Sequence, residues 1–403
     1  MTKIKVHSKA LEKTIGIDRV IGEINGLHKG PTLIFMGGIH GNEPAGVFAL
    51  NRFIESMRHL RDAMYGNIIC LTGNLGALRE GIRFHDEDLN RVWTRERMAS
   101  LSQSNGIGSN NEVNEQREIF SIIQHVLDTH SGPFYFFDLH TTSSETIPFL
   151  TVNDSLLNRD FTIQYPLHII LGIEEYLDGP ILSYINELGY VAFGFEAGQH
   201  DDMSSIENNM AFCYLSAVFT GLINKDLVDY HHYHDMLAKT SGDVQSIYEI
   251  HFRYLIKTGE LFTMETGFFN FQKVYKNQLV AKSDGKEVRA KNDGRIFMPL
   301  YQAQGSDGFF TIKKIWKPFL RISAIIRKYR LDRMLVLLPG VKWIDHSKSG
   351  LIVNKKIARF LAREIFHLFG YRSMVIDKNH AKMFYRDASA RFEEYLNQPW
   401  ITH

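Results

Sequence analysis

The chain has 403 residues, of which 44% are hydrophobic and 23% are charged, an ordinary composition for a globular protein of two or three domains. No apolar run approaches 18 residues, so we expect no transmembrane helix. The first 13 residues are basic and lack an apolar core, and two lone cysteines do not form a disulfide framework. We therefore expect a cytoplasmic protein with reduced thiols.

The net charge of +1 conceals an uneven distribution. Residues 311–403 contain 19 Lys and Arg against 7 Asp and Glu, and the rest of the chain contains 27 against 38. The basic tail could pack against the acidic body, or it could meet a phosphate-rich partner or an anionic membrane surface. We favour packing on the body, and we expect no nucleic-acid partner because the tail matches no nucleic-acid-binding motif.

The spacing of apolar residues predicts alternating strands and helices between residues 31 and 223. In chain order we expect strand 31–36, helix 44–59, strand 67–71, a polar loop at 102–114, helix 114–129, strands 134–139 and 190–195, and helix 205–222. This alternation indicates an α/β fold, a mixed central sheet flanked by helices.

Three regions follow from these patterns. The first domain is expected at residues 1–230, and a linker containing His231, His232 and His234 follows it. Short strands separated by glycines predict a smaller β domain at 240–316. Residues 317–403 are expected to form a basic, mainly helical extension, with helices at 351–369 and 381–396.

A glycine-rich turn, GGIHGNEPAG at residues 37–46, joins the first expected strand to the first expected helix. Open α/β sheets place ligands at such turns, at the carboxyl ends of their strands. His40 and Glu43 lie three residues apart there and could reach one metal ion together. Such a pair is weak evidence alone, because most are unrelated surface residues.

The end of strand 134–139 carries the sequence DLHTT and brings in a second histidine, His140. If the two strands are neighbours, His40, Glu43 and His140 supply two imidazoles and one carboxylate. That is the ligand set of a catalytic zinc ion with one position left for water. Asp138 could orient a ligand histidine, or it could simply cap the next turn.

Two further stretches carry residues suited to amide chemistry. Arg83 could polarise a carbonyl, and Asn90 with Arg91 could hold a carboxylate, although charged residues so close together usually form a solvated loop. Glu196 follows an apolar strand and could transfer a proton during hydrolysis. A structural ion pair between Glu196 and Arg83 is the alternative.

Taken in order, four motifs resemble one family: HxxE at 40–43, DLNR at 88–91, DLHT at 138–141 and EAG at 196–198. They are similar to the succinylglutamate desuccinylase/aspartoacylase family of zinc-dependent amide hydrolases, which are related to the zinc carboxypeptidases. The resemblance spans about residues 25–225 and continues weakly into GRIFMP at 294–299. It implies a zinc carboxypeptidase-like domain followed by a smaller β domain, and it does not extend past residue 317.

The resemblance also implies the roles of the individual residues. One Zn²⁺ per chain would be bound by His40, Glu43 and His140, and Glu196 would be the general base. Arg83 would polarise the carbonyl. The residues implied to contact the substrate are Asn90, Arg91 and Thr141. Metal-activated water would attack the amide carbonyl of a small N-acyl amino acid, and Glu196 would protonate the departing amine.

Two alternatives remain at this point. One is a zinc carboxypeptidase that acts on short peptides, which the β domain disfavours because in the resembling family that domain crowds the entrance to the site. The other is a non-catalytic relative that binds zinc or a small carboxylate ligand, or docks through its basic tail. The oligomeric state is open, a homo-oligomer included.

The basic residues near Glu196 bear on the substrate. Aspartoacylases hold their acidic substrate with an additional arginine shortly before the base. Between His140 and Glu196 this chain has one Lys or Arg, Arg159. A buried carboxylate without a partner costs several kcal/mol. Unless Arg159 replaces the missing arginine, we expect a substrate other than N-acetylaspartate, with at most one carboxylate near the zinc.

Overall fold

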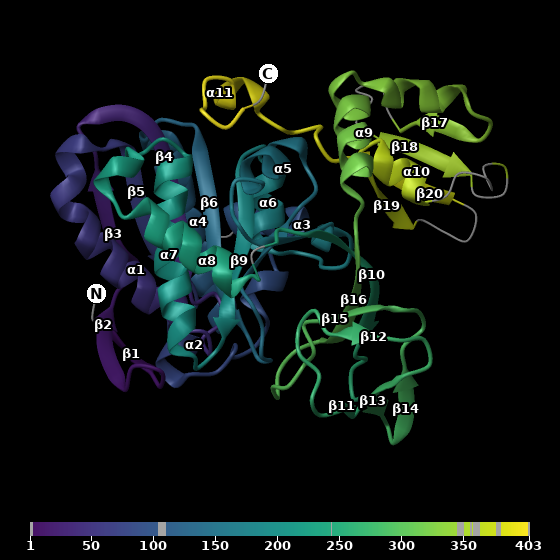
Figure 1. Cartoon of the computed structure of the whole chain (residues 1–403), viewed down its shortest axis with the longest axis horizontal. Coiled ribbons are helices and arrows are strands. Elements are labelled where there is room, and N and C mark those ends of the chain that lie inside the picture. Colours follow the sequence, from purple (N-terminus) through teal and green to yellow (C-terminus); the bar gives the residue numbers. More distant parts are fainter. Residues whose placement is uncertain are drawn as a thin grey trace.

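The structure is a computed structural model of the whole chain (Figure 1). It describes residues 3–103, 110–242, 244–344, 350–354, 357, 363–375 and 380–401. Below, residues 3–242 are called the body, 247–314 the β region and 317–401 the C-terminal lobe. Within the described residues, none of the helices has the length and apolar character needed to cross a membrane.

An eleven-stranded mixed sheet forms the centre of the molecule, in the order β12-β15-β16-β10-β8-β7-β9-β6-β4-β5-β3. Strands β5, β4, β6 and β9 run parallel to one another. Strand β7 runs in the opposite direction, because it pairs antiparallel with β9. The strands from the body are β3 (Val20–Asn25), β4 (His28–Gly37), β5 (Tyr65–Thr72), β6 (Phe134–Thr142), β7 (Phe149–Val152), β8 (His168–Leu171) and β9 (Val191–Gln199). The mixed, helix-flanked sheet predicted from the sequence is confirmed.

Helices cover both faces of this sheet because side chains alternate along the buried strands. In β4, Leu33 and Phe35 join one hydrophobic cluster, and Ile34 and Met36 join another. The first cluster packs under α1 (Ala45–Met57), α7 (Met203–Phe219) and α8 (Tyr230–Thr240), which lie in front of the sheet in Figure 1. The second packs under α3 (Arg95–Gln103), α4 (Asn111–Thr129) and α6 (Ile181–Glu187).

The smaller elements of the body complete this arrangement. Strands β1 (Ile4–Ser8) and β2 (Lys13–Ile17) pair as an antiparallel hairpin. Helices α2 (Leu75–Glu80) and α5 (Leu156–Thr162) follow β5 and β7. Both cysteines, Cys70 in β5 and Cys213 in α7, are buried and free, as expected.

Two local predictions for the body differ from the structure. Helix α4 begins at Asn111, inside the expected loop, because the Asn110 side chain accepts a hydrogen bond from the Val113 backbone N–H and caps the helix. Residues 104–109 of the expected loop lie outside the described residues. The histidines expected in a linker belong to α8, where the ring of Tyr233 stacks on Tyr214 at 4.4 Å. That contact fixes the segment to the body.

The β region is continuous with the central sheet. Strand β10 (Ile247–Leu255) pairs with β8 of the body, and β16 (Asp307–Lys314), β15 (Gly294–Phe297) and β12 (Lys273–Val274) extend the same sheet. A separate sheet contains β11 (Phe262–Met264), β13 (Leu279–Ser283) and β14 (Lys286–Arg289). The β content expected at 240–316 is present, and the domain boundaries remain a prediction.

The helices expected at 351–369 and 381–396 are wrong at their starts, because each of these stretches begins with a strand. Helices α9 (Lys317–Lys328), α10 (Arg363–Leu368) and α11 (Phe392–Tyr395) accompany a four-stranded antiparallel sheet. Its strands are β17 (Val341–Trp343), β18 (Gly350–Asn354), β20 (His380–Tyr385) and β19 (Tyr371–Val375). Residues 351–354 and 381–385 form strands because β18 pairs with β20, and short apolar runs alone do not separate the two periodicities.

The basic lobe packs against the acidic body, as we favoured. Arg327 is fully buried, and its guanidinium donates to Asp387 of the lobe at 2.9 Å and to Asp154 of the body at 3.3 Å. Arg386 reaches Asp154 at 2.6 Å and Glu174 at 3.1 Å. Opposite charges on the two parts are thus paired where the lobe meets the body.

The end of the chain returns to the body. The Tyr395 hydroxyl donates to the Phe134 carbonyl and accepts from the Val191 N–H at 3.0 Å. The Trp400 indole N–H donates to the Tyr135 hydroxyl at 3.0 Å. Figure 1 shows α11 beside the body, separated from the rest of the lobe. These residues cover the starts of β6 and β9, the ends opposite the candidate site.

Candidate metal centre and active site

The turn after β4 brings His40 and Glu43 together. The Glu43 N–H donates to the His40 carbonyl at 3.2 Å, and α1 starts two residues later. Gly41 is required, because a Cβ there would lie 2.1 Å from the Ala77 carbonyl carbon. The close backbone packing holds both functional side chains at the carboxyl end of β4.

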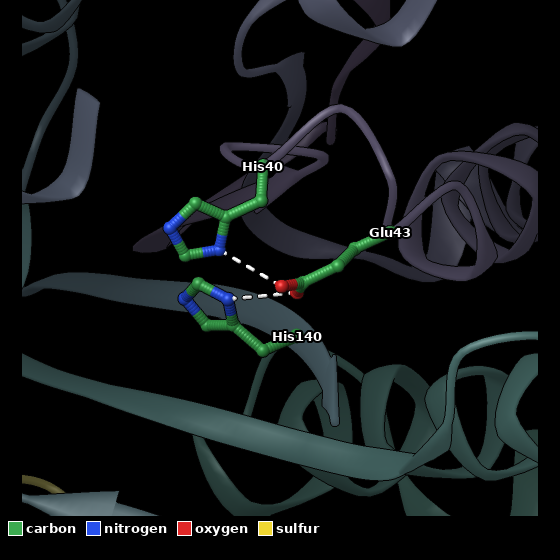
Figure 2. Close-up of side chains that lie close together, drawn as sticks. All are labelled: His40, Glu43 and His140. Carbon is green, nitrogen blue, oxygen red and sulfur yellow. Dashed lines mark hydrogen bonds and ion pairs between the residues drawn. The ribbon is translucent and has the colours of Figure 1, made fainter. Parts of the chain in front are cut away.

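His140 reaches the same place from the next strand. Strands β4 and β6 are parallel neighbours with Gly37 paired to Leu139, so their carboxyl ends lie at one edge of the sheet. His40, Glu43 and His140 each offer a ligand atom, and these atoms lie within 4.8 Å of one another (Figure 2). All three side chains are buried. The structure therefore brings the three predicted ligands into one cluster.

Both imidazoles point Nδ1 toward the Glu43 carboxylate, at 2.9 Å for His40 and 3.1 Å for His140 (Figure 2). The outer nitrogens face carboxylates: His40 Nε2 lies 3.0 Å from Asp88, and His140 Nε2 lies 2.8 Å from Asp138. A carboxylate on the outer nitrogen fixes the ring and makes the inner nitrogen a better ligand. This donor set fits a divalent metal ion.

The charge on Glu43 is held in place by its neighbours. Burial raises the pKa of this carboxyl, but the charge of His40 and hydrogen bonds from both imidazoles hold it well below its ordinary value. The Thr141 backbone N–H donates a further hydrogen bond to it at 3.0 Å. Glu43 is therefore an ionised carboxylate, the form that binds a cation.

Glu196 lies beside the cluster on β9, paired in register with His140 of β6. It is buried, and its Oε2 atom has no hydrogen-bond partner among the described residues. Burial raises the pKa of Glu196 to about 8. The predicted alternative, an ion pair with Arg83, is not what the structure shows, because Arg83 pairs with Glu43 at 3.3 Å and Asp88 at 3.2 Å.

The predicted carboxylate-binding residues lie next to the cluster on a short 3₁₀ turn, Leu89–Arg91. The Asn90 Oδ1 atom accepts from the Ile181 N–H at 3.0 Å, and its Nδ2 lies 3.5 Å from His140. Arg91 already has a carboxylate partner within the protein, since its Nη2 lies 3.5 Å from Asp307 of the β region. A substrate carboxylate would have to share Arg91 with Asp307.

One cavity of about 140 Å³ contains all the candidate residues in its lining. They are His40, Glu43, Arg83, Asn90, Arg91, His140, Thr141 and Glu196. Arg159 is absent from this lining within the described part of the chain, and its Nη2 donates to Asp154 at 2.8 Å. Arg159 therefore does not replace the missing arginine.

Beyond the polar cluster, the cavity has an apolar wall. Its side chains come from the segment before β9, from β9 itself and from the β region. They are Ile173, Leu177, Pro180, Leu182, Phe193, Met298, Leu300 and Phe310. The part of the chain in which aspartoacylases carry the additional arginine thus contributes leucines and a proline.

Sequence reasoning missed several polar residues of this cavity, among them His200, Gln302 and Asp307. His200 accompanies Thr141, with 2.8 Å between His200 Nδ1 and Thr141 Oγ1. Gln302 lies 2.9 Å from Asn42 and 3.2 Å from His200, and Asp307 contacts Arg91. His200 closely follows the EAG motif, so its position in the sequence could have marked it as a candidate site residue. The other two come from a region distant in sequence that carries no local signal.

The fold and the cavity define a mixed α/β domain with a metal-ligand cluster at its strand ends. Residues 29–207 match the model of the succinylglutamate desuccinylase/aspartoacylase catalytic domain. The match falls on the part of the chain that carries the four motifs, so it confirms the resemblance that they indicated.

Curated relatives match shorter stretches. Aspartoacylase of Xenopus tropicalis is 32% identical over 136 residues, which are 32% of this chain and 39% of that protein. An N-acyl-aromatic-L-amino acid amidohydrolase (carboxylate-forming) of Xenopus laevis is 32% identical over 113 residues, 28% of this chain and 34% of that protein. The chain spans less than half the length of these relatives.

Solved structures agree on the fold. The crystal structure of a succinylglutamate desuccinylase/aspartoacylase from Rhodobacter sphaeroides superposes with a TM-score of 0.54 at 15% sequence identity. The superposition covers 75% of this chain and 91% of that one. At this identity the likeness establishes the architecture alone.

Proposed function

We propose that this protein is a zinc-dependent hydrolase that cleaves the amide bond of a small N-acyl amino acid. The observation that carries the proposal is the buried His40, Glu43 and His140 cluster, with Glu196 and Arg83 in the same cavity. Metal ligands, a carboxylate without a partner and a guanidinium together form a set that hydrolyses amides.

His40 and His140 would hold one zinc ion through Nδ1, and Glu43 would hold it through its carboxylate. Zinc in such a site acts as a Lewis acid and lowers the pKa of water to about 7. Asp88 and Asp138 would keep the two rings in orientation through hydrogen bonds to Nε2. The buried, preformed arrangement of these donors supports zinc as the cofactor.

Glu196 and Arg83 would carry out the proton transfer and the charge stabilisation. A cation held by His40, Glu43 and His140 would favour the ionised form of Glu196, and this carboxylate would take a proton from the attacking water and give it to the departing nitrogen, a role that contributes about 10²–10⁴-fold. The unpartnered Oε2 atom leaves this group free to do so. Arg83, fixed by Glu43 and Asp88, would donate hydrogen bonds to the oxyanion that forms from the carbonyl.

The cavity favours a substrate with one carboxylate and an uncharged remainder. Asn90 and Arg91 can hold one carboxylate, whereas Asp307 beside Arg91 would repel a second one. The apolar wall offers no cationic partner, and Arg159 lies elsewhere. A relative whose name specifies N-acyl-aromatic L-amino acids supports an uncharged side chain. N-acetylaspartate is therefore not the proposed substrate.

The size of the substrate is limited by the β region. Several residues of the segment 298–307 line the cavity, and the Gln304 side chain forms hydrogen bonds with the backbone of Arg83 and Phe84 at 3.2 Å each. Gln302 bonds Asn42 across the same opening. Because these hydrogen bonds hold the segment 298–307 at the cavity, little room is left there for a longer peptide. This arrangement disfavours the carboxypeptidase alternative.

The test is a screen of the zinc-loaded protein against N-acyl derivatives of neutral, aromatic and acidic amino acids, with release of the free amino acid as the readout. Short peptides with free N-termini serve as the comparison. We expect hydrolysis of the neutral or aromatic N-acyl compounds. Cleavage of peptides longer than about three residues would favour the carboxypeptidase, and zinc binding without any hydrolysis would favour the non-catalytic relative.

A further inference from the structure

An exposed apolar surface lies on the C-terminal lobe, over α9 and the turn that follows it. Trp316, Ile325 and Tyr329 are 74%, 56% and 69% exposed. The remaining large apolar side chains exposed in this stretch are Ile322, Leu331, Met334 and Leu337. We call the exposed side of residues 316–337 the α9 face. Soluble surfaces rarely concentrate large apolar side chains in this way.

The same face is strongly basic. Its exposed cationic residues are Lys317, Arg321, Lys328 and Arg333, and the exposed Lys313 and Lys314 at the end of β16 directly precede it. Every residue from Lys313 to Trp343 is described, and Asp332 is the only acidic one among them. Asp332 is buried and pairs with Arg330 at 3.0 Å. Lys328 also interacts with Asp160 of the body, a partly buried carboxyl outside this stretch. The exposed charges of the α9 face are thus of one sign.

Helix geometry separates the two kinds of side chain. At 100° per residue, Lys317, Arg321 and Lys328 fall within one narrow stripe, and Ile322, Ile325 and Tyr329 form the stripe beside it. Both stripes are exposed. The lobe therefore presents an apolar band that is flanked by cations along the helix axis.

The opposite side of α9 is anchored. Ser323 donates to the Leu368 carbonyl at 2.8 Å, and Arg327 pairs with Asp387 and Asp154. Both side chains are fully buried. The α9 face therefore remains exposed in the folded chain, and exposing it requires no rearrangement of the lobe.

We propose that the α9 face docks the protein on an anionic membrane surface. Apolar side chains on one stripe and Lys and Arg on the next are what an interfacial helix uses to lie at the headgroup boundary. Trp and Tyr prefer that boundary, and each basic residue gains from the negative potential of anionic lipids. A nucleic acid would match the charge but would leave Ile322 and Ile325 in water.

Vesicle co-sedimentation of the full chain tests this docking, and it does not depend on hydrolase activity. One set of vesicles is phosphatidylcholine alone, and the other contains about 30% phosphatidylglycerol to supply the negative surface. We expect the protein to pellet with the anionic vesicles and to stay in solution with the neutral ones. Raising the salt to about 1 M should reduce binding to the anionic vesicles by screening the cations.

Variants assign the binding to the α9 face. The double variant Ile325→Glu/Tyr329→Glu should lower the bound fraction by about tenfold or more, because charges replace buried apolar contacts at the headgroups. The matched control is Leu261→Glu/Tyr275→Glu, which changes two exposed apolar residues of the β region and should bind like the parent. Unchanged circular dichroism and thermal unfolding confirm that each variant is folded.

Three results would overturn the proposal. The first is no binding of the parent to anionic vesicles, and the second is equal binding of the α9 double variant and the parent. The third is a parent dimer, seen by light scattering, that Ile325→Glu/Tyr329→Glu dissociates. That result would assign the face to a second copy of the chain. Loss of hydrolase activity alone would leave the docking result unaffected.

Discussion

Asp138 and His140 lie two residues apart on β6, and a distance of 2.8 Å separates Asp138 Oδ2 from His140 Nε2. Residues at this spacing share one face of a strand, so the backbone itself places the carboxylate behind the ring. The contact turns His140 Nδ1 toward Glu43. The DLH motif thus supplies a ligand together with the group that orients it.

Asp138→Asn should keep the fold and weaken metal binding by about 10–100-fold, the usual effect of losing the carboxylate that orients a ligand histidine. The measurement is competition for zinc with a chelator of known affinity. Asp201→Asn, a surface change near the site, is the control and should bind zinc like the parent. Equal affinity of Asp138→Asn and parent would show that Asp138 only supports the local backbone.

His140→Ala should abolish stoichiometric zinc, because it leaves two protein ligands where three are needed for a stable catalytic site. Elemental analysis of metal-replete protein should give one zinc per chain for the parent and well under one for the variant. Full zinc in the variant would place the ion elsewhere. Activity with cobalt or manganese would be compatible with the proposal, since geometry rather than affinity decides function.

Glu196→Gln should retain zinc and fold but lose most hydrolysis, by about 10²–10⁴-fold in kcat, because glutamine cannot accept the proton in the transition state. The readouts are steady-state kinetics and zinc content on the same preparation. Activity within about tenfold of the parent would mean that another group is the base.

The ratio of kcat/KM for N-acetylaspartate to that for N-acyl derivatives of neutral amino acids should be well below one. Asp307 beside Arg91 and the apolar wall both disfavour a second carboxylate. Arg91→Ala should raise KM for the neutral substrates by removing the partner of their single carboxylate. A preference of the parent for N-acetylaspartate would show that a cationic group outside the described cavity lining serves the second carboxylate.

His168 should make folding stability depend on pH. Burial, Lys314 and Arg295 lower its pKa to about 4, and its Nδ1 has no partner in the described part of the chain. The unfolded chain, with a histidine pKa of about 6.5, then binds more protons between about pH 4 and 6.5. The stability that neutral His168 contributes is fully present above about pH 6.5, and it is lost as the pH falls from about 6.5 to about 4.

His168→Phe tests this, because a phenyl ring can keep the packing against Tyr248 and Phe271 but cannot be protonated. Urea unfolding at several pH values should show a smaller loss of stability between about pH 6.5 and 4 than in the parent. His232→Gln, on the exposed side of α8, should match the parent. Identical slopes for His168→Phe and parent would assign the pH dependence to other groups.

The parallel arrangement of β4, β6 and β9 explains which residues of the candidate site could be predicted from the sequence. Because β4, β6 and β9 run parallel as neighbours, polar residues that follow their apolar runs must meet, which places His40, His140 and Glu196 at one edge. Asp307 could not be predicted as a partner of Arg91, since that contact joins regions more than 200 residues apart and depends on how the β region sits. The strands β18 and β20 were missed for a similar reason: each is defined by pairing with the other.

The contacts of Tyr395 and Trp400 set the order in which the molecule can be completed. Trp400 bonds Tyr135, 265 residues earlier in the chain, and Tyr395 bonds the start of β9, 204 residues earlier. A ribosome that adds about 5–20 residues per second needs roughly 10–50 s to bridge the longer interval. During that time the start of β6 lacks the residues that cover it, so the body finishes folding only after Trp400 has been translated.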